Sequence, residues 1–192
     1  GDYVVVVPLP DPQAPGQRYM FRDGRRGSTA DDNAPVTCAE GAVAIRKSDG
    51  TEERWKQFPL TTSDTRFASV ETELAGRLIE PGGAAAGGKR PLVVMVHGSE
   101  RTSALNSSYA YSLAAQGIAV FVYDKRGTGN SEGEYTQNFE LLAADAAAAL
   151  AHAKTLTAGR VERVGYFGGS QGGWVAPLAA TRSAAEFVAI GF

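Results

Sequence analysis

The second half of the chain contains short runs of apolar residues that few or no polar residues interrupt. Residues 92–96 read Leu-Val-Val-Met-Val, and residues 118–123 form a similar run of β-branched, small and aromatic residues. Strands without alternating polar positions are typical of a parallel sheet that helices cover on both faces. The predicted strands are 92–96, 118–123, 163–167 and 187–190, and the predicted helices are 107–116, 139–156 and 172–180. The pattern therefore predicts an α/β protein with a mostly parallel sheet and helices on both faces.

The first part of the chain predicts strands rather than helices. Short strands are expected at residues 3–7, 17–22, 42–46, 67–70 and 73–79. The dipeptide Asp49-Gly50 predicts a tight hairpin turn, because these residues readily adopt positive φ. Residues 81–91 are rich in Gly, Ala and Pro, which predicts a flexible turn or linker. We therefore expect a β-rich N-terminal extension at residues 1–70 and the N-terminal part of an α/β core at residues 71–192.

Composition and charge narrow the class of protein. The chain has 192 residues with 19 Lys+Arg against 21 Asp+Glu, and a net charge of -2 argues against a nucleic-acid-binding protein. No run approaches the roughly 18 apolar residues of a membrane span, so a soluble protein is expected. The single cysteine, Cys38, excludes an internal disulfide and a cysteine-built zinc site. Residue 1 is Gly rather than Met, which favours a processed and exported chain, periplasmic or secreted, although the compartment stays open.

Residues 168–172 carry the pattern G-x-S-x-G, with Ser170 at its centre. The pentapeptide follows a predicted strand and opens a predicted helix, which is the context of a sharp turn that exposes a nucleophile. Gly168 and Gly172 are small because bulkier side chains would collide where the chain doubles back. The turn brings the Gln171 N–H to the helix N-terminus, where negative charge is favoured. The alternative is a glycine-rich turn with an N-cap serine, but the context favours a catalytic serine.

A second motif, His97-Gly98-Ser99-Glu100, follows the first apolar run. An acyl-transfer enzyme needs two N–H donors for the developing oxyanion, and one of them comes from a loop after an earlier strand. We expect the Ser99 N–H to be this donor, paired with the Gln171 N–H. The alternative is an ordinary loop with a structural histidine.

A third segment, residues 123–131, reads Tyr-Asp-Lys-Arg-Gly-Thr-Gly-Asn-Ser and follows the second apolar run. Its glycines are those of a tight loop, but it has neither of the two common phosphate-binding patterns. We expect a structural loop in which Asp124 and Arg126 are internal pairing or capping groups.

In this order, the strands and the motifs at His97, Asp124 and Ser170 resemble the α/β-hydrolase family, in its esterase and serine-aminopeptidase-like branch. The resemblance covers about residues 70–192. It implies an eight-stranded sheet in complete members, a serine nucleophile at Ser170, and an acid and a histidine later in the chain. It also implies that His97 shapes its loop rather than acting as the base. It implies no metal or organic cofactor.

The chain departs from the family pattern after Ser170. The 22 residues that follow contain one acid, Glu186, and no histidine. His152 lies within a predicted helix and, like His97, is expected to be structural. We therefore expect the C-terminal strands, the acid and the base to lie beyond Phe192, on a missing segment or on a second chain. A degenerate binding module, or a different acid and base, would also explain the pattern.

The expected function is a serine hydrolase that cleaves a carboxylic ester through an acyl-enzyme on Ser170, and that is inactive as the isolated segment. Acyl-peptide, peptide and thioester hydrolysis use the same turn and are alternatives, and a catalytically dead binding module is the non-enzyme alternative. Glu100, Tyr135 and Trp174 are candidate contacts for a small ester or acyl substrate. Trp174 either packs against the sheet or lines an acyl pocket. Substrate identity and oligomeric state cannot be predicted from these residues.

Overall fold

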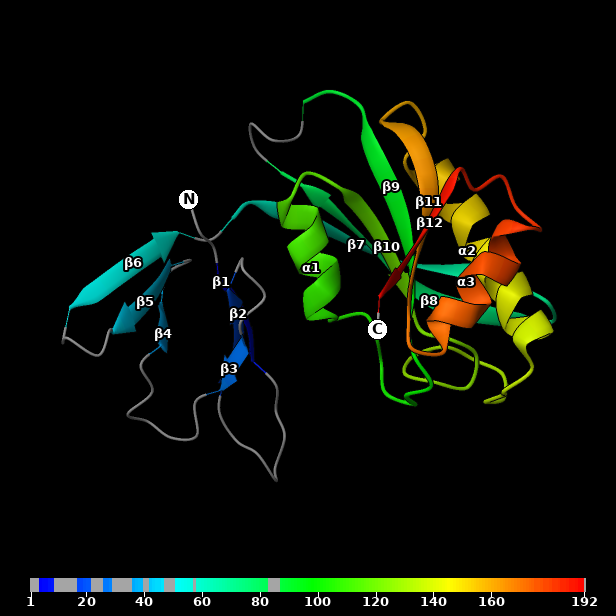
Figure 1. The fold of residues 1–192 in the computed structure, drawn as a ribbon, viewed down its shortest axis with the longest axis horizontal. Coiled ribbons are helices and arrows are strands. Elements are labelled where there is room, and N and C mark those ends of the chain that lie inside the picture. The colour runs from blue at the N-terminus through cyan, green and yellow to red at the C-terminus, as the bar shows by residue number, and fades with distance from the viewer. Residues whose placement is uncertain are drawn as a thin grey trace. The chain divides into compact units, whose positions relative to one another are not determined.

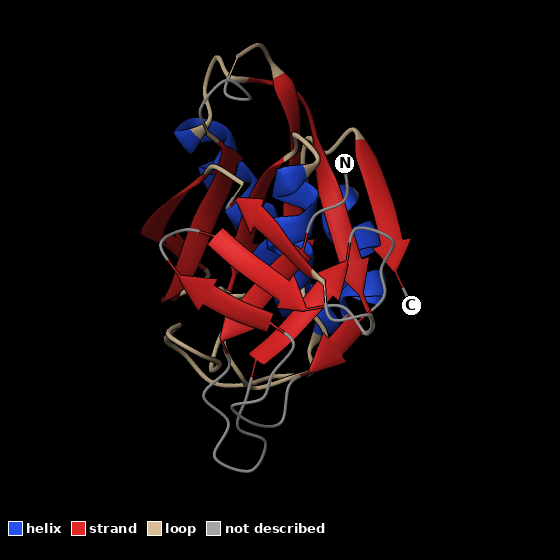
Figure 2. Ribbon diagram, turned by 90° about the vertical axis from the view of Figure 1, so that its left-hand side faces the viewer, coloured by secondary structure: helices blue, strands red, loops and turns tan. Residues whose placement is uncertain are grey.

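The described residues of the first unit of the chain form short antiparallel strands. The computed structural model describes residues 4–8, 17–21, 26–28, 36–39, 42–46, 51–56, 58–82 and 87–191. The chain forms two compact units, residues 1–59 and residues 60–192. The described part of the first unit contains one sheet of β1 (Val4–Pro8), β2 (Gln17–Phe21) and β3 (Arg26–Ser28), and another of β4 (Val36–Ala39), β5 (Ala42–Arg46) and β6 (Glu52–Lys56) (Figure 1). Figure 2 draws the described strands of the chain in red and its helices in blue. The predicted hairpin turn at Asp49-Gly50 lies outside the described residues, and β5 and β6 on either side of it pair antiparallel.

The second unit is built on a sheet that, among the described residues, has the strand order β12-β11-β9-β10-β8-β7 (Figure 1). Its strands are β7 (Leu60–Ser69), β8 (Thr72–Pro81), β9 (Arg90–Val96), β10 (Ala119–Tyr123), β11 (Val161–Gly169) and β12 (Phe187–Gly191). Its helices are α1 (Ser108–Ala115), α2 (Phe139–Leu156) and α3 (Gly172–Ala180). The four strands β9 to β12 run parallel to one another. Strand β8 pairs antiparallel with β10, and β7 pairs antiparallel with β8. The prediction of a mostly parallel α/β sheet is confirmed.

Strand β7 belongs to the second unit. It pairs with β8 along its whole length, from Leu60 opposite Pro81 to Ser69 opposite Thr72. The first compact unit therefore ends at Pro59 along the chain, whereas the sequence suggested a boundary at residue 70. The physical reason is that β7 has 10 residues and begins at Leu60, whereas a strand was predicted only at residues 67–70, because the first half of β7 is exposed and mostly polar.

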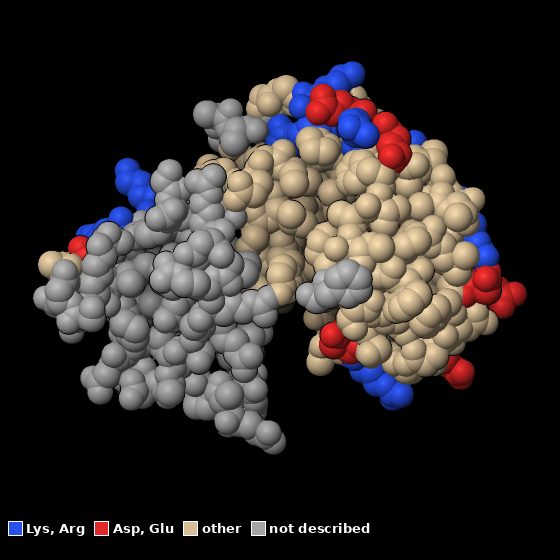
Figure 3. All heavy atoms as spheres, in the orientation of Figure 1, with Lys and Arg blue, Asp and Glu red and all other residues tan. Residues whose placement is uncertain are grey.

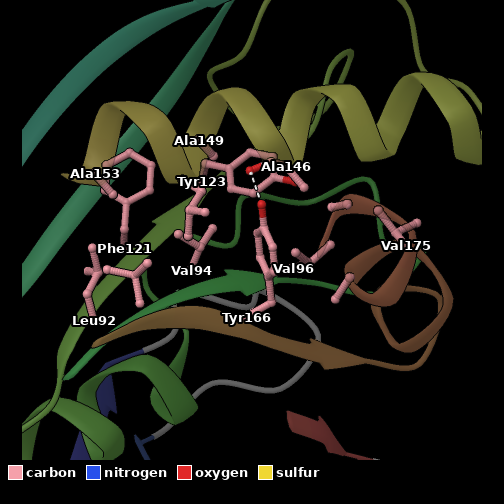
Figure 4. Close-up of a cluster of buried hydrophobic side chains, with 14 of the residues drawn as sticks. Leu92, Val94, Val96, Phe121, Tyr123, Ala146, Ala149, Ala153, Tyr166 and Val175 are labelled. Atoms are coloured by element: carbon pink, nitrogen blue, oxygen red, sulfur yellow. Dashed lines mark hydrogen bonds between the residues drawn. The ribbon is translucent and has the colours of Figure 1, made fainter. Parts of the chain in front are cut away.

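Helix α2 covers one face of the sheet with a stripe of small residues. Its buried apolar positions recur every three or four residues and are Leu142, Ala143, Ala146, Ala149, Leu150 and Ala153. Alanine at these positions lets the helix axis approach the sheet closely, and Leu92, Val94, Phe121 and Tyr166 fill the space beneath it (Figure 4). The Tyr166 hydroxyl donates to the Ala146 carbonyl at 3.3 Å, which satisfies a polar group inside this core.

Helix α1 covers the opposite face. Met95, Val120 and Val122 alternate with the residues that face α2, and they pack with Ala110 and Ala114 of α1. Gly117 follows the helix with φ 93, and its N–H donates to the Ala114 carbonyl, as the predicted helix end requires. Helices therefore cover both faces, as predicted.

The surface of the second unit carries charges of both signs. On the face drawn in Figure 3, acidic and basic side chains lie near one another at the margins, and most of the remaining surface is uncharged. This mixture agrees with the small net charge of the chain. None of the helices that the structure describes is long and apolar enough to cross a membrane.

A buried ion pair joins α2 to the loop after β10. Asp145 is fully buried, and it accepts hydrogen bonds from Arg126 Nε at 2.7 Å and Nη2 at 2.6 Å. The Ser69 hydroxyl donates to the same carboxylate at 2.6 Å. The prediction that Arg126 is an internal pairing group is confirmed. Asp124 caps the same loop as predicted, since it accepts from the N–H groups of Ala104 and Asn130.

Replacing Asp145 by Asn should leave the Arg126 cation buried without its counter-charge. We expect Asp145→Asn to lower the free energy of unfolding by about 3 kcal/mol, because breaking a buried pair strands one charge. The matched control is Asp64→Asn. Asp64 lies on the exposed half of β7 and pairs with Arg77 of β8, so its loss should cost less than about 1 kcal/mol. Urea unfolding of both variants measures the difference, and equal costs would contradict this account.

Candidate active site

The turn between β11 and α3 holds Ser170 in a rare backbone conformation. Ser170 has φ 50, which side-chain-bearing residues seldom adopt, and the residue is exposed. The carbonyls of Ser170 and Gln171 accept the first backbone hydrogen bonds of α3, from the N–H groups of Gly173 and Trp174. The strained residue thus lies between the end of β11 and the start of α3, beyond the carboxyl ends of the parallel strands, where such sheets place binding sites.

Two glycines make this turn possible. A Cβ atom on Gly172 would lie 1.9 Å from the Val96 carbonyl oxygen, and one on Gly168 would lie 2.2 Å from the Gly172 oxygen. Both obstacles are backbone atoms that cannot rotate away. The first turn of α3 therefore lies directly against the end of β9, as the sequence interpretation of these glycines expects.

The loop after β9 begins with a buried histidine. His97 Nε2 accepts the Lys125 N–H at 3.3 Å, so the ring proton lies on Nδ1, which is 3.8 Å from a Glu100 carboxylate oxygen. Burial is the main cause that lowers the pKa of His97 to about 4, and the nearby Lys125 ammonium lowers it further. His97 is therefore neutral at physiological pH, and its basic nitrogen is already occupied.

The second histidine lies far from this turn in the sheet. His152 of α2 stacks on Phe67 of β7 with ring centroids 5.4 Å apart, and its Nε2 lies 3.0 Å from the Thr65 hydroxyl. Three strands, β8, β10 and β9, separate β7 from β11. His152 therefore serves a helix–sheet contact, and the structure does not bring it to Ser170.

The loop after β10 contributes a buried cation that the sequence interpretation missed. Lys125 is 1% exposed, and its Nζ donates hydrogen bonds to the Gly98 carbonyl and to Gln171 Oε1. Burial lowers the pKa of this ammonium to about 8. One signal in the sequence could have identified it. Lys125 lies just after a buried strand, between Asp124 and Arg126, which were both expected to be internal pairing or capping groups.

A hydrogen-bonded path continues from Gln171 along the rim of the site. Gln171 Nε2 donates to Gln137 Oε1, and Gln137 Nε2 donates to the Tyr135 hydroxyl. The Tyr135 hydroxyl in turn donates to the Ser99 carbonyl at 3.2 Å. The structure therefore connects the predicted residues Ser99, Tyr135 and Gln171 in one hydrogen-bonded path, and Gln171 joins this path to Lys125.

The other predicted substrate contacts are exposed. The Glu100 carboxylate lies against Gly98, where a Cβ atom would meet its Oε2 at 2.6 Å. Trp174 is 72% exposed, which excludes the interpretation that it packs in the core. The Arg101 guanidinium lies 4.1 Å from the centre of the Tyr135 ring. Within the described residues, no group of three or more His, Cys, Asp or Glu side chains is arranged to hold a metal ion.

Comparison with known proteins identifies the family of the chain. Residues 87–190 match the family described as serine aminopeptidase, S33, and the chain belongs to this family of hydrolases. Its second unit has the α/β-hydrolase fold. No curated protein matches the chain.

Several solved structures resemble the chain. A hypothetical protein from Pseudomonas aeruginosa shares 19% identity at a TM-score of 0.60, over 84% of this chain and 46% of that protein. Est1E from Butyrivibrio proteoclasticus, solved with ferulic acid bound, shares 23% sequence identity at a TM-score of 0.55. The match covers 65% of this chain and 50% of that protein. Brefeldin A esterase, described as a bacterial homologue of human hormone-sensitive lipase, shares 25% sequence identity at a TM-score of 0.54. The match covers 66% of this chain and 37% of that protein. The chain thus spans half or less of the length of these proteins.

The two neighbouring glycines of the turn should respond differently to the same substitution. Gly168→Ala places a methyl group against backbone and should lower the free energy of unfolding by about 3 kcal/mol. Gly169→Ala should change it by less than about 1 kcal/mol, because nothing lies within 4 Å of a Cβ there. Urea unfolding of the two variants is the measurement, and a Gly168→Ala protein as stable as Gly169→Ala would refute the close approach.

Proposed function

We propose that the chain carries the nucleophile of a serine hydrolase that cleaves carboxylic esters through an acyl-enzyme on Ser170. The observation that carries this proposal is the exposed Ser170 at φ 50, at the start of α3 and between two glycines that tolerate no Cβ. Residues held in the left-handed region cluster at active sites. Glu71 in the β7–β8 turn also has a positive φ, of 56, so the φ of Ser170 supports the proposal only together with the two closely packed glycines and the start of α3. Membership of a hydrolase family supports the same reading.

The proposed oxyanion hole consists of the backbone N–H groups of Ser99 and Gln171. Gln171 lies at the N-terminus of α3, where the helix dipole and unpaired N–H groups favour negative charge. The Lys125 side chain bridges Gly98 and Gln171, which supports a common site for the two segments. Removing one donor from such a site typically costs about 10²–10³ in rate.

The proposed base is a histidine from outside residues 1–192, oriented by a carboxylate that also lies outside them. This part of the proposal is supported by the contacts that both histidines of the chain already make. His97 Nε2 accepts the Lys125 N–H, and His152 contacts Thr65 and Phe67. A natural protein with no histidine beyond these two would overturn the mechanism.

The reaction proceeds in two halves. The external histidine takes the Ser170 hydroxyl proton while Oγ attacks the ester carbonyl, and the oxyanion is held by the two N–H groups. The histidine then gives its proton to the leaving alcohol, which departs and leaves an acyl-enzyme. Water attacks this ester and loses a proton to the histidine, and the proton returns to Ser170 as the carboxylic acid leaves. Glu100, Tyr135 and Trp174 are proposed contacts for the acyl or alcohol group.

Peptide hydrolysis is a second candidate, because the matched family is described as serine aminopeptidase. The names of the similar solved structures favour the ester. Comparing a nitrophenyl ester, an acyl thioester and an aminoacyl nitroanilide as substrates of the full-length protein separates the three chemistries.

Replacement of Ser170 tests the nucleophile. A fluorophosphonate probe should label the full-length protein at Ser170, and Ser170→Ala should abolish both labelling and ester turnover, since the bond-forming oxygen is gone. Ser63→Ala, on the exposed half of β7, is the matched control and should label like the unsubstituted protein. Unlabelled Ser170 together with no ester turnover would favour a binding module instead of an enzyme.

Replacement of Ser99 tests the backbone donor. Ser99→Pro removes the N–H and should lower kcat by about 10²–10³, whereas Ser99→Ala keeps the N–H and should lose less than about tenfold. Steady-state turnover of a nitrophenyl ester by both variants is the measurement. If Ser99→Ala lowers kcat as much as Ser99→Pro does, or if neither lowers kcat, the Ser99 N–H does not hold the oxyanion and the proposed oxyanion hole is wrong.

A further inference from the structure

We propose that Lys125 is a positioning residue that orients and polarises both backbone donors of the oxyanion hole. This inference rests on the proposed function and adds a residue to it. It is carried by two contacts of one buried ammonium group: Lys125 Nζ donates to the Gly98 carbonyl and to Gln171 Oε1. Each acceptor belongs to, or directly adjoins, one of the two proposed donors.

The burial of Lys125 demands an explanation beyond packing. Lysine is among the residues least often buried completely, because removing an ammonium from water is costly. Lys125 is nevertheless 1% exposed, and both groups that accept from Nζ are neutral. A salt bridge for stability alone would place a carboxylate at this point. The charge is instead held between the two loops that carry the proposed donors.

The contact with Gly98 acts on the first donor through a single peptide unit. The Gly98 carbonyl and the Ser99 N–H belong to the same peptide group, which is trans. In a trans peptide these two bonds point in opposite directions, so a cation that holds the carbonyl also sets the direction of the N–H. Electron withdrawal at the carbonyl oxygen strengthens the same N–H as a donor.

The contact with Gln171 acts on the second donor through a fixed side chain. Gln171 Oε1 accepts from Lys125, and Gln171 Nε2 donates to Gln137, so both ends of the amide are held. A side chain fixed at both ends restricts the backbone of its own residue, which supplies the second N–H. Gln171 is 8% exposed, so water does not readily replace these contacts.

The charge of Lys125 also lies behind the site where negative charge develops in the transition state. A cation in a buried site interacts more strongly with such a charge than one in water. The titratable groups around it are His97 and Glu100 after β9 and Asp124 after β10. His97 is neutral above pH about 4, and Glu100 favours the protonated lysine. The pKa of Lys125 is about 8, so the charge is present at neutral pH and is lost as the pH rises.

The test uses the full-length protein with a nitrophenyl ester and compares three variants. Lys125→Met removes the charge and the donor, and we expect kcat to fall about 100-fold with KM changed less than about threefold. Lys154→Met, at the exposed end of α2, is the matched control and should leave both constants unchanged. Lys125→Arg keeps a charge that does not titrate and should recover part of kcat.

The pH profile separates a positioning role from a merely structural one. In the unsubstituted protein kcat should fall as the pH rises through about 8, and this fall should be absent from Lys125→Arg. A Lys125→Met protein with unchanged kcat, or an alkaline fall that persists in Lys125→Arg, overturns the inference. If Lys125→Met does not fold, the Lys125→Arg profile decides. An unsubstituted protein with neither turnover nor labelling of Ser170 overturns the proposed function itself, and this inference with it.

Discussion

The second unit depends on one close approach of backbone to backbone. The first turn of α3 lies against the end of β9, where the Gly172 Cα leaves no room for a Cβ beside the Val96 carbonyl. Only a residue without a side chain lets a helix start this near to a sheet. The same approach bends the chain at Ser170 to φ 50 and brings the loop after β9 to the start of α3. The geometry of the candidate site follows from this contact.

Parallel strands explain why the site is assembled from three separate loops. Strands β9, β10 and β11 end at the same edge of the sheet, so the loops that follow them meet there. Buried polar groups at such a meeting point must satisfy one another. The buried Lys125 and Gln171 satisfy each other, and the hydrogen-bonded path continues through the more exposed Gln137, Tyr135 and Ser99. This path ties the loops into one unit and restricts the groups that face a substrate.

Local patterns were most informative where one physical effect dominates. The helical periodicity at residues 139–156 and the glycines at 168 and 172 predicted α2 and the start of α3 at their observed bounds. Prediction was poorer where partners are distant. The start of β7 was missed because its first half is polar, and Trp174 is exposed although its aromatic ring suggested packing against the sheet. The pairing of Arg126 was expected, but its partner Asp145 was not, since an acid within an alanine-rich helix reads as exposed.

The order of strands, helices and small-residue turns along the chain was enough to define the fold class, the family and the position of Ser170, because these depend on residues close in sequence. The environment of the site was not accessible in this way. Gly98 and Gln171 are separated from Lys125 by 27 and 46 residues, and the packed sheet brings their polar atoms within hydrogen-bond distance. Burial by that packing also removes water from Lys125 and His97, and so sets which of them is charged.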